Sequence, residues 1–272
     1  MAAADREAEL DEGRMPFLAH LREFRDRLRN AAICFLIATV VCWFFAKDMY
    51  AELRVPLDHA MANYPQFASI KMKYNVLTEP FWVYMSVALW SGVFVASPLI
   101  FYQLWQFIAP GLYKHERRFG VVFAAISGLF FVSGALFCHQ LVLEPMFKYL
   151  LGMTGSDAEP ALTMSGYLDL TRDMMLAFGA VFEMPIIIYF LAKVGLVTHK
   201  SLWRFNRWFV VIAFIIGAVL TPSADVVSQS LMALPMIALY NLSIIVAWVV
   251  VRNKRKAAQA AGFDDAPPDD AA

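Results

Sequence analysis

The chain has 272 residues, of which 60% are hydrophobic and 17% are charged, and its formal net charge is zero. Soluble domains carry about 25% charged residues, so this composition excludes an ordinary soluble protein. Several apolar runs of about 15–25 residues are long enough to cross roughly 30 Å of hydrocarbon as helices. The sequence therefore predicts an all-α integral membrane protein.

An amphipathic segment precedes the first apolar run. Over residues 15–30 the apolar side chains recur at helical spacing, while basic residues occupy the remaining faces. The recurring apolar residues are Phe17, Leu21, Phe24 and Leu28. This pattern predicts an N-terminal amphipathic helix that lies on the membrane surface before the first span.

The apolar runs predict six transmembrane helices in a single membrane domain over residues 1–256, followed by a disordered Ala/Asp/Pro-rich tail over residues 257–272. The expected spans are residues 31–46, 81–107, 119–142, 173–194, 208–220 and 226–251. A polar loop over residues 47–80 separates the first two spans and contains an expected short helix at Met49–Leu57. A second polar loop is expected over residues 143–171.

The distribution of basic residues predicts the orientation. Six spans place both termini on one side of the membrane, and the segments on that side hold 17 of the 23 Lys and Arg residues. Loops rich in Lys and Arg stay in the cytoplasm. Both termini are therefore expected to be cytoplasmic.

A charged elbow connects the second and third spans. The helical pattern breaks at Pro110, and the charged stretch Lys114–Arg118 follows, with Glu116 inside it. A carboxylate at the membrane surface can pair with arginines of a ligand, and the bidentate geometry favours arginine over lysine. Glu116 also fits a solvated loop charge that its neighbouring arginines balance. Glu23, which also has arginines beside it, admits the same two interpretations.

Glu183 lies in the middle of the fourth predicted span, between Phe182 and Met184. An ionisable side chain at the bilayer centre costs about 2.5–3.5 kcal/mol on insertion scales, so it should face a cavity or a partner. The alternative is a protonated glutamic acid that a neighbouring helix satisfies.

Two further patterns lie in the fifth and sixth spans. Asp225 and Gln229 could direct polar groups into a cavity or towards a partner helix, although an Asp at this place is also a common helix N-cap. The fifth span is short, because Phe209–Leu220 covers only about 18 Å as a helix. Its Ala213-x-x-x-Gly217 pattern permits close helix approach, either within the bundle or with the helix of another subunit.

Motifs with defined chemistry are missing from the sequence, including G-x-x-x-x-G-K-[ST], H-E-x-x-H and a Ser/His/Asp pattern. The three cysteines lie in apolar runs without C-x-x-C spacing. Neither enzyme activity nor binding of a metal, cofactor or nucleic acid is expected. A protein-translocation subunit and a secondary transporter of a small solute remain, although the two halves do not mirror one another as transporter repeats do.

Four motifs, in order along the chain, resemble those of the TatC family, the signal-peptide receptor subunits of the twin-arginine protein translocase. They are H-L-R-E-F-R-D-R-L at 20–28, Y-Q-L-W-Q-F-I-A-P-G-L-Y-K-H-E-R-R at 102–118, F-G-A-V-F-E-M-P at 178–185 and L-T-P-S-A-D-V-V-S-Q at 220–229. The resemblance covers nearly the whole chain. It implies a six-helix bundle in the inner membrane of a bacterial cell, with both termini in the cytoplasm.

The resemblance also implies roles for individual residues. Glu23 and Glu116 match cytoplasmic carboxylates implicated in recognising the twin-arginine motif, and Phe107 matches an aromatic residue at the same site. Glu183 matches the family's buried glutamate. Asp225 and Gln229 match its polar pair at the outer end of the sixth span, and Pro56 and Pro110 match its structural prolines.

The implied partners are twin-arginine signal peptides of folded cargo proteins, TatB-like and TatA-like single-span subunits, other copies of the chain and membrane lipid. In this family the single-span partners are thought to dock along the fifth and sixth spans, and the proton-motive force is expected to drive export without ATP use by this subunit.

Overall fold

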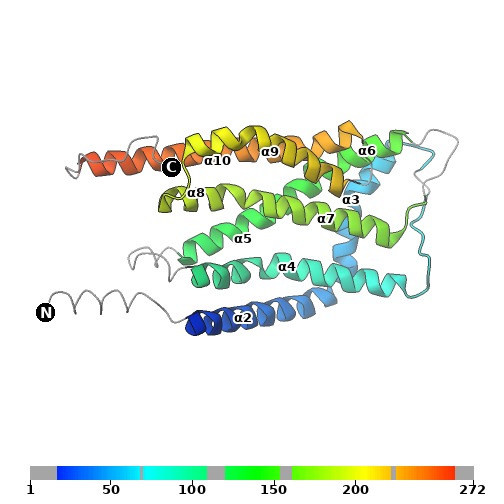
Figure 1. The fold of residues 1–272 in the computed structure, drawn as a ribbon. Helices are drawn as coiled ribbons and strands as arrows, with labels where there is room; N and C mark the ends of the chain where they lie inside the picture. The colour runs from blue at the N-terminus through cyan, green and yellow to red at the C-terminus, as the bar shows by residue number, and fades with distance from the viewer. Residues whose placement is uncertain (1–16, 68–69, 109–119, 154–160, 222–224, 261–272) are drawn as a thin grey trace.

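The structure, a computed structural model of the chain, describes residues 17–67, 70–108, 120–153, 161–221 and 225–260. Its helices run alongside one another in an elongated bundle (Figure 1). Within the described residues, six helical segments are long and apolar enough to cross a membrane, which confirms the predicted number of spans. The first described helix begins, and the last one ends, at one end of the bundle, called here the terminal end. The opposite end is called the far end.

The described helices follow the predicted order. They are α2 (Phe17–Phe44), α3 (Ala46–Ala62), α4 (Glu79–Ile108), α5 (Gly120–Phe137), the π-helical turn η3 (Cys138–Val142), α6 (Leu143–Met153), α7 (Met164–Phe182), α8 (Met184–Val194), α9 (His199–Leu220) and α10 (Val226–Ala260). The tail was predicted to begin at residue 257, but α10 continues to Ala260, and the later residues lie outside the described part of the chain.

The N-terminal segment differs from the prediction. The surface helix expected over residues 15–30 and the span expected over residues 31–46 form one continuous helix, α2, which lies beside α4. Its sequence contains neither Pro nor Gly, so nothing in the local chemistry ends the helix between the charged and the apolar halves. The apolar candidate span within it is His20–Phe44.

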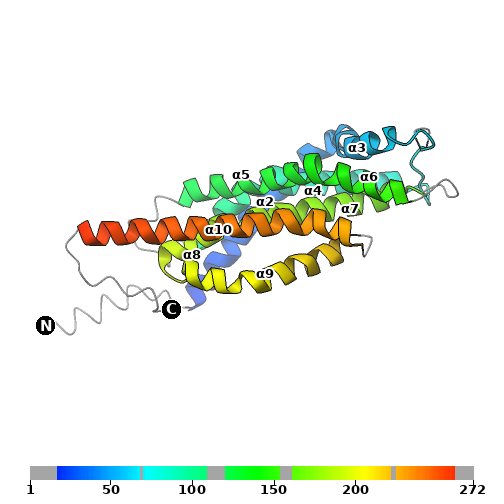
Figure 2. The ribbon, with the colours of Figure 1, turned by 90° about the horizontal axis from the view of Figure 1, so that it is seen from above.

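At the far end, α3 crosses the bundle instead of running along it (Figures 1 and 2). Two tyrosine hydroxyls hold it in place: Tyr64 donates to the carbonyl oxygen of Lys148 on α6 at 2.9 Å, and Tyr167 on α7 donates to that of Leu53 at 2.6 Å. Pro56, expected to be structural, is buried inside α3.

The second polar loop is shorter than predicted. Residues 143–153 form α6, because four apolar residues at helical spacing are buried there: Leu143, Met146, Phe147 and Leu151. α7 begins at Met164, where Thr163 Oγ1 accepts a hydrogen bond from Gly166 N at 3.2 Å as an N-cap. The loop prediction rested on Gly and Pro residues and overlooked the helical spacing before them.

The main core joins α3, α6, α7, α9 and α10. One residue from each of these helices is at most 2% exposed: Leu57, Met146, Phe178, Ala213 and Met232. Glycines let the helix backbones approach closely, since a Cβ on Gly128 of α5 would lie 2.7 Å from Pro98 Cα of α4. α9 and α10 are similarly close, because a Cβ on Gly217 would lie 3.2 Å from the carbonyl oxygen of Gln229.

This contact gives the Ala213-x-x-x-Gly217 pattern its structural use. Both residues are buried against α10, so in this chain the small pair packs two of its own helices together. α9 also begins earlier than the predicted fifth span, at His199, and is about 33 Å long. Its first nine residues are mostly polar or basic, so its apolar part is still short.

Candidate functional site

Two of the three residues predicted to bind the signal peptide lie on neighbouring helices at the terminal end of the bundle. Glu23 lies in the first turns of α2, and Phe107 lies in the last turn of α4. The third, Glu116, lies outside the described residues, as does Pro110. The structure therefore describes Glu23 and Phe107 of the predicted signal-peptide site, but not Glu116.

Polar contacts join the two helices beside Glu23. Arg27 Nη2 lies 3.4 Å from Glu23 Oε1, one turn earlier on α2. The other terminal nitrogen, Arg27 Nη1, donates to Gln103 Oε1 at 3.4 Å and to Gln106 Oε1, both on α4. The Arg27 guanidinium thus contacts three side-chain oxygens through its N–H donors, one on α2 and two on α4.

Aromatic rings cover the same helix pair. The Phe107 ring stacks on the His20 imidazole at 4.5 Å between centroids, with an interplanar angle of 19°. Phe24, one turn after His20 on α2, contacts the Phe107 ring at 5.3 Å between centroids and 59°. Both partners come from α2, so Phe107 anchors the end of α4 against the start of α2.

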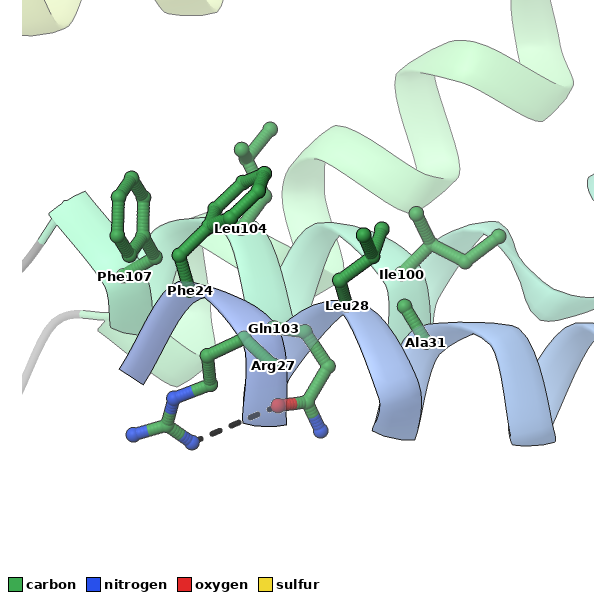
Figure 3. A pocket seen from close by; sticks show the side chains of 8 residues that line it. All are labelled: Phe24, Arg27, Leu28, Ala31, Ile100, Gln103, Leu104 and Phe107. Carbon is green, nitrogen blue, oxygen red and sulfur yellow. Dashed lines mark hydrogen bonds between the residues drawn. The ribbon is translucent and has the colours of Figure 1, made fainter. Parts of the chain in front are cut away.

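Between the two helices is a groove of about 150 Å³ (Figure 3). Six of its eight lining residues are apolar; the full set is Phe24, Arg27, Leu28, Ala31, Ile100, Gln103, Leu104 and Phe107. Figure 3 shows the Arg27 and Gln103 side chains on one side of the helix pair, away from the rings of Phe24 and Phe107. The arrangement can accept an apolar side chain beside an ion-pairing edge.

The Glu23 carboxylate is partly accessible. Its side chain is 19% exposed and that of Arg27 is 28% exposed, so the pair stands at the edge of the protein. Arg25 and Arg29 pair instead with Asp26, at 3.1 and 3.6 Å. An incoming cation at Glu23 would share or replace Arg27, which is the arginine paired with Glu23 in the structure.

Glu183 occupies a break between two helices. It separates α7 from α8, and Pro185 follows at the second position of α8. The residue is 5% exposed, and its Oε1 atom has no hydrogen-bond partner among the described residues. The carboxyl lies beside the Ser127 hydroxyl and the backbone of Phe131, both on α5.

Sequence reasoning missed the residues that surround Glu183. Ser127 Oγ accepts a hydrogen bond from Trp105 Nε1 on α4 at 3.2 Å. Trp105 packs with Ala124 and Ile186 in a small buried cluster. A serine and a tryptophan within apolar runs were the signals for this site, but nothing in their spacing indicated that they meet. Trp105 therefore places the Glu183 region next to the turn of α4 that carries Phe107.

Asp225 and Gln229 lie at the far end and do not belong to either site. Asp225 Oδ1 accepts a hydrogen bond from Ser228 N at 2.8 Å, which is the N-cap arrangement for α10. The Tyr149 hydroxyl on α6 is also within reach of the Asp225 carboxylate. The Gln229 backbone packs on Gly217, so both residues connect α10 to its neighbours.

Glu79 was not singled out from the sequence, yet it is 7% exposed at the start of α4. Its Oε2 accepts from Asn75 N at 2.6 Å, and its Oε1 accepts from Ser165 Oγ at 2.7 Å and Ser165 N at 3.2 Å. These bonds join α4 to the first turn of α7. Among the described residues no cluster of His, Cys, Asp or Glu could hold a metal ion.

Comparison with known protein families gives a match over residues 19–235 to the family described as Sec-independent protein translocase protein (TatC). A TatC protein of Aquifex aeolicus (strain VF5) is 39% identical over 244 residues, which are 89% of this chain and 98% of the relative. A TatC protein of Koribacter versatilis (strain Ellin345) is 39% identical over 247 residues and 90% of each chain.

Solved structures agree with this match. A structure titled "Crystal Structure of Twin Arginine Translocase Receptor- TatC" superposes with a TM-score of 0.73 at 39% identity. The superposition covers 85% of this chain and 99% of the other. A second structure of a TatC receptor, in DDM, gives a TM-score of 0.74 over 84% of this chain.

Proposed function

Because this chain belongs to the TatC family of Sec-independent protein translocase proteins, we propose that it binds the paired arginines of signal peptides at the terminal end of its bundle. Membership makes it a multi-pass membrane subunit of the twin-arginine translocase, a transport component and not a small-solute transporter. The observation that carries the finer proposal is the pairing of Glu23 with Arg27, which lines the same apolar groove as Phe107.

Exchange of ion-pair partners is the first step of the mechanism. A guanidinium of the peptide pairs with Glu23, while Arg27 keeps its contacts with Gln103 and Gln106 on α4. The replaced bond is a single contact of 3.4 Å, whereas a guanidinium can offer the carboxylate two parallel bonds. Lysine lacks this planar fork, so arginine is preferred. The rings of Phe24 and Phe107 line the apolar groove beside this ion pair.

The second arginine of the pair is assigned to Glu116, which lies outside the described residues. The apolar segment of the peptide follows along the groove towards Ile100 and Ala31, which line its deeper part on α4 and α2. Apolar lining favours this segment because burial removes its side chains from water.

The later steps of export involve the rest of the bundle. TatB-like and TatA-like subunits dock on the exposed faces of α9 and α10, and several copies of the chain assemble. The short apolar part of α9 and the buried Glu183 thin the bilayer locally, and the proton-motive force drives passage of the folded cargo. Both termini are cytoplasmic, and the membrane is a bacterial inner membrane, in keeping with the excess of basic residues on the terminal side.

Peptide binding tests the recognition step. A signal peptide with Arg-Arg and its Lys-Lys version are titrated against the purified chain and its Glu23→Gln variant. We expect the wild type to favour Arg-Arg by about tenfold, since a charge-assisted hydrogen bond contributes about 1.5–3 kcal/mol, and the variant to lose most of this preference.

Glu52→Gln is the matched control, because Glu52 is an exposed carboxylate on α3 at the far end. This variant should bind like the wild type. Equal binding of both peptides by the wild type, or an unchanged preference in Glu23→Gln, would show that Glu23 does not read the arginine pair.

A further inference from the structure

Basic residues outnumber acidic ones over the last three helices, α8 to α10. Residues 184–263 contain eight Lys or Arg and a single acidic residue, Asp225. Asp225 lies at the far end, where it caps α10. The terminal ends of α8, α9 and α10 are therefore basic, and the two long helices α9 and α10 supply no carboxylate there.

Three of these basic residues share one face of α9. Lys200, Arg204 and Arg207 follow one another at intervals of four and three residues, which places them on one ridge of a helix. All three are exposed. They are called here the basic face of α9, and they span about 10 Å along the helix axis.

The rotation of α9 is fixed by its other face. The Phe209 ring stacks on Tyr240 of α10 at 4.1 Å with an interplanar angle of 11°, and the Tyr240 hydroxyl donates to the carbonyl oxygen of Leu202 at 2.9 Å. Ala213 and Gly217 are buried on the same side. The opposite side of α9 packs against α10 along most of its length. The basic face therefore points away from the bundle.

The exposed ridge changes character towards the far end. Trp203 and Trp208 flank the basic face and are 66% and 57% exposed. Beyond them the same exposed side continues with the apolar residues Val211, Ile215 and Val219. Trp208 lies between Arg207 and Val211, and tryptophan is enriched where hydrocarbon meets headgroups, so the change from cations to aliphatic residues at Trp208 matches the layers of a bilayer leaflet.

We propose that the basic face of α9 binds the headgroups of anionic phospholipids, with their acyl chains along Val211 and Ile215. Three exposed basic residues on one ridge complement a phosphodiester, and the guanidinium groups of Arg204 and Arg207 can bind phosphate oxygens bidentately. The aliphatic continuation of the ridge favours a lipid over an acidic protein segment. The headgroup of a lipid can contact the cations while its acyl chains contact the aliphatic residues. The proposal stands apart from peptide binding at Glu23.

Lipid binding to the purified full chain tests this site. Native mass spectrometry in detergent measures the dissociation constants of phosphatidylglycerol and phosphatidylcholine. We expect the wild type to prefer phosphatidylglycerol and the triple variant Lys200→Gln, Arg204→Gln, Arg207→Gln to lose this preference. The expected loss is about fivefold for each removed cation, on the order of 100-fold in all, and less at high salt.

The matched control removes three exposed lysines at the other end of the bundle, as Lys47→Gln, Lys71→Gln, Lys73→Gln. It has the same net charge as the first variant and should keep the preference. If the triple variant is unstable, Arg204→Gln alone should weaken phosphatidylglycerol binding about fivefold. Equal binding of both lipids by the wild type, or equal losses in both triple variants, would overturn the proposal. The variant without Lys200, Arg204 and Arg207 could also keep its lipid preference but no longer co-purify with an acidic subunit. That result would overturn the proposal, because the basic face would then bind a protein.

Discussion

Glu183 and Glu79 are both buried glutamates, but their surroundings differ. Both carboxylate oxygens of Glu79 accept hydrogen bonds, from Asn75 and Ser165, whereas Oε1 of Glu183 has no partner among the described residues. A buried polar group without a partner costs about 1–3 kcal/mol, so Glu183 weakens the fold while Glu79 strengthens it. Trp105, bonded to Ser127 beside Glu183, connects this costly residue to the helix turn that carries the proposed peptide site. Because the unpaired oxygen of Glu183 brings no gain in stability, we propose a functional role for this residue.

Replacing each glutamate with leucine should separate the two roles. Glu183→Leu should leave the free energy of unfolding unchanged or raise it by about 1–3 kcal/mol, because it removes a buried carboxyl with one unpaired oxygen, while export falls at least about tenfold. Glu79→Leu should lower the free energy of unfolding by about 1–3 kcal/mol, because it leaves buried donors unpaired. Thermal unfolding in detergent and export of a folded reporter measure the two effects. Normal export by a stable Glu183→Leu variant would contradict the proposed role of the buried carboxyl.

At the scale of helices, the small residues of α9 show how the pattern of a docking motif serves packing inside one chain. Ala213 and Gly217 face α10 and are buried, while the opposite side of α9 carries the exposed basic and apolar ridge. A partner helix that docks on α9 in the assembled translocase cannot use the small pair, because α10 already occupies it.

Gly217→Leu should consequently destabilise the isolated chain. Its side chain would meet the Gln229 backbone, and overpacking of this kind costs about 1–3 kcal/mol. Ala218→Leu is the control, since it adds a larger side chain at the next residue, on the exposed side of the helix. Thermal unfolding of both variants, without any other subunit, measures the difference. A stable Gly217→Leu variant that fails only to bind a partner subunit would show that the pair is a docking surface after all.

The same scale shows what the sequence could predict. Six apolar runs yielded six spans, because the cost of exposing backbone groups to lipid leaves helices as the structure of such runs. The ends of helices were less predictable. α2 continues through the predicted boundary at residue 30, and α6 was taken for a loop, since charged residues and a nearby Gly or Pro also occur inside helices when tertiary packing holds them.

For the molecule as a whole, the proposed site illustrates the same limit. The sequence indicated Glu23 and Phe107 separately, and the structure brings them to one pair of helices. It could not indicate Arg27 as the partner of Glu23, or the bond between Trp105 and Ser127, because contacts between distant segments depend on how the helices are rotated and crossed. Periodicity reports which face of a helix is apolar, but not which neighbour covers it.

Export by living cells tests the central claim most directly. The chain and its single-span partners are supplied to bacteria that lack their own TatC protein, with a folded reporter that carries an Arg-Arg or a Lys-Lys signal peptide. We expect only the Arg-Arg reporter to cross the membrane out of the cytoplasm. We also expect export to stop when an uncoupler collapses the proton-motive force. Equal export of both reporters, or export that continues with the uncoupler, would contradict it.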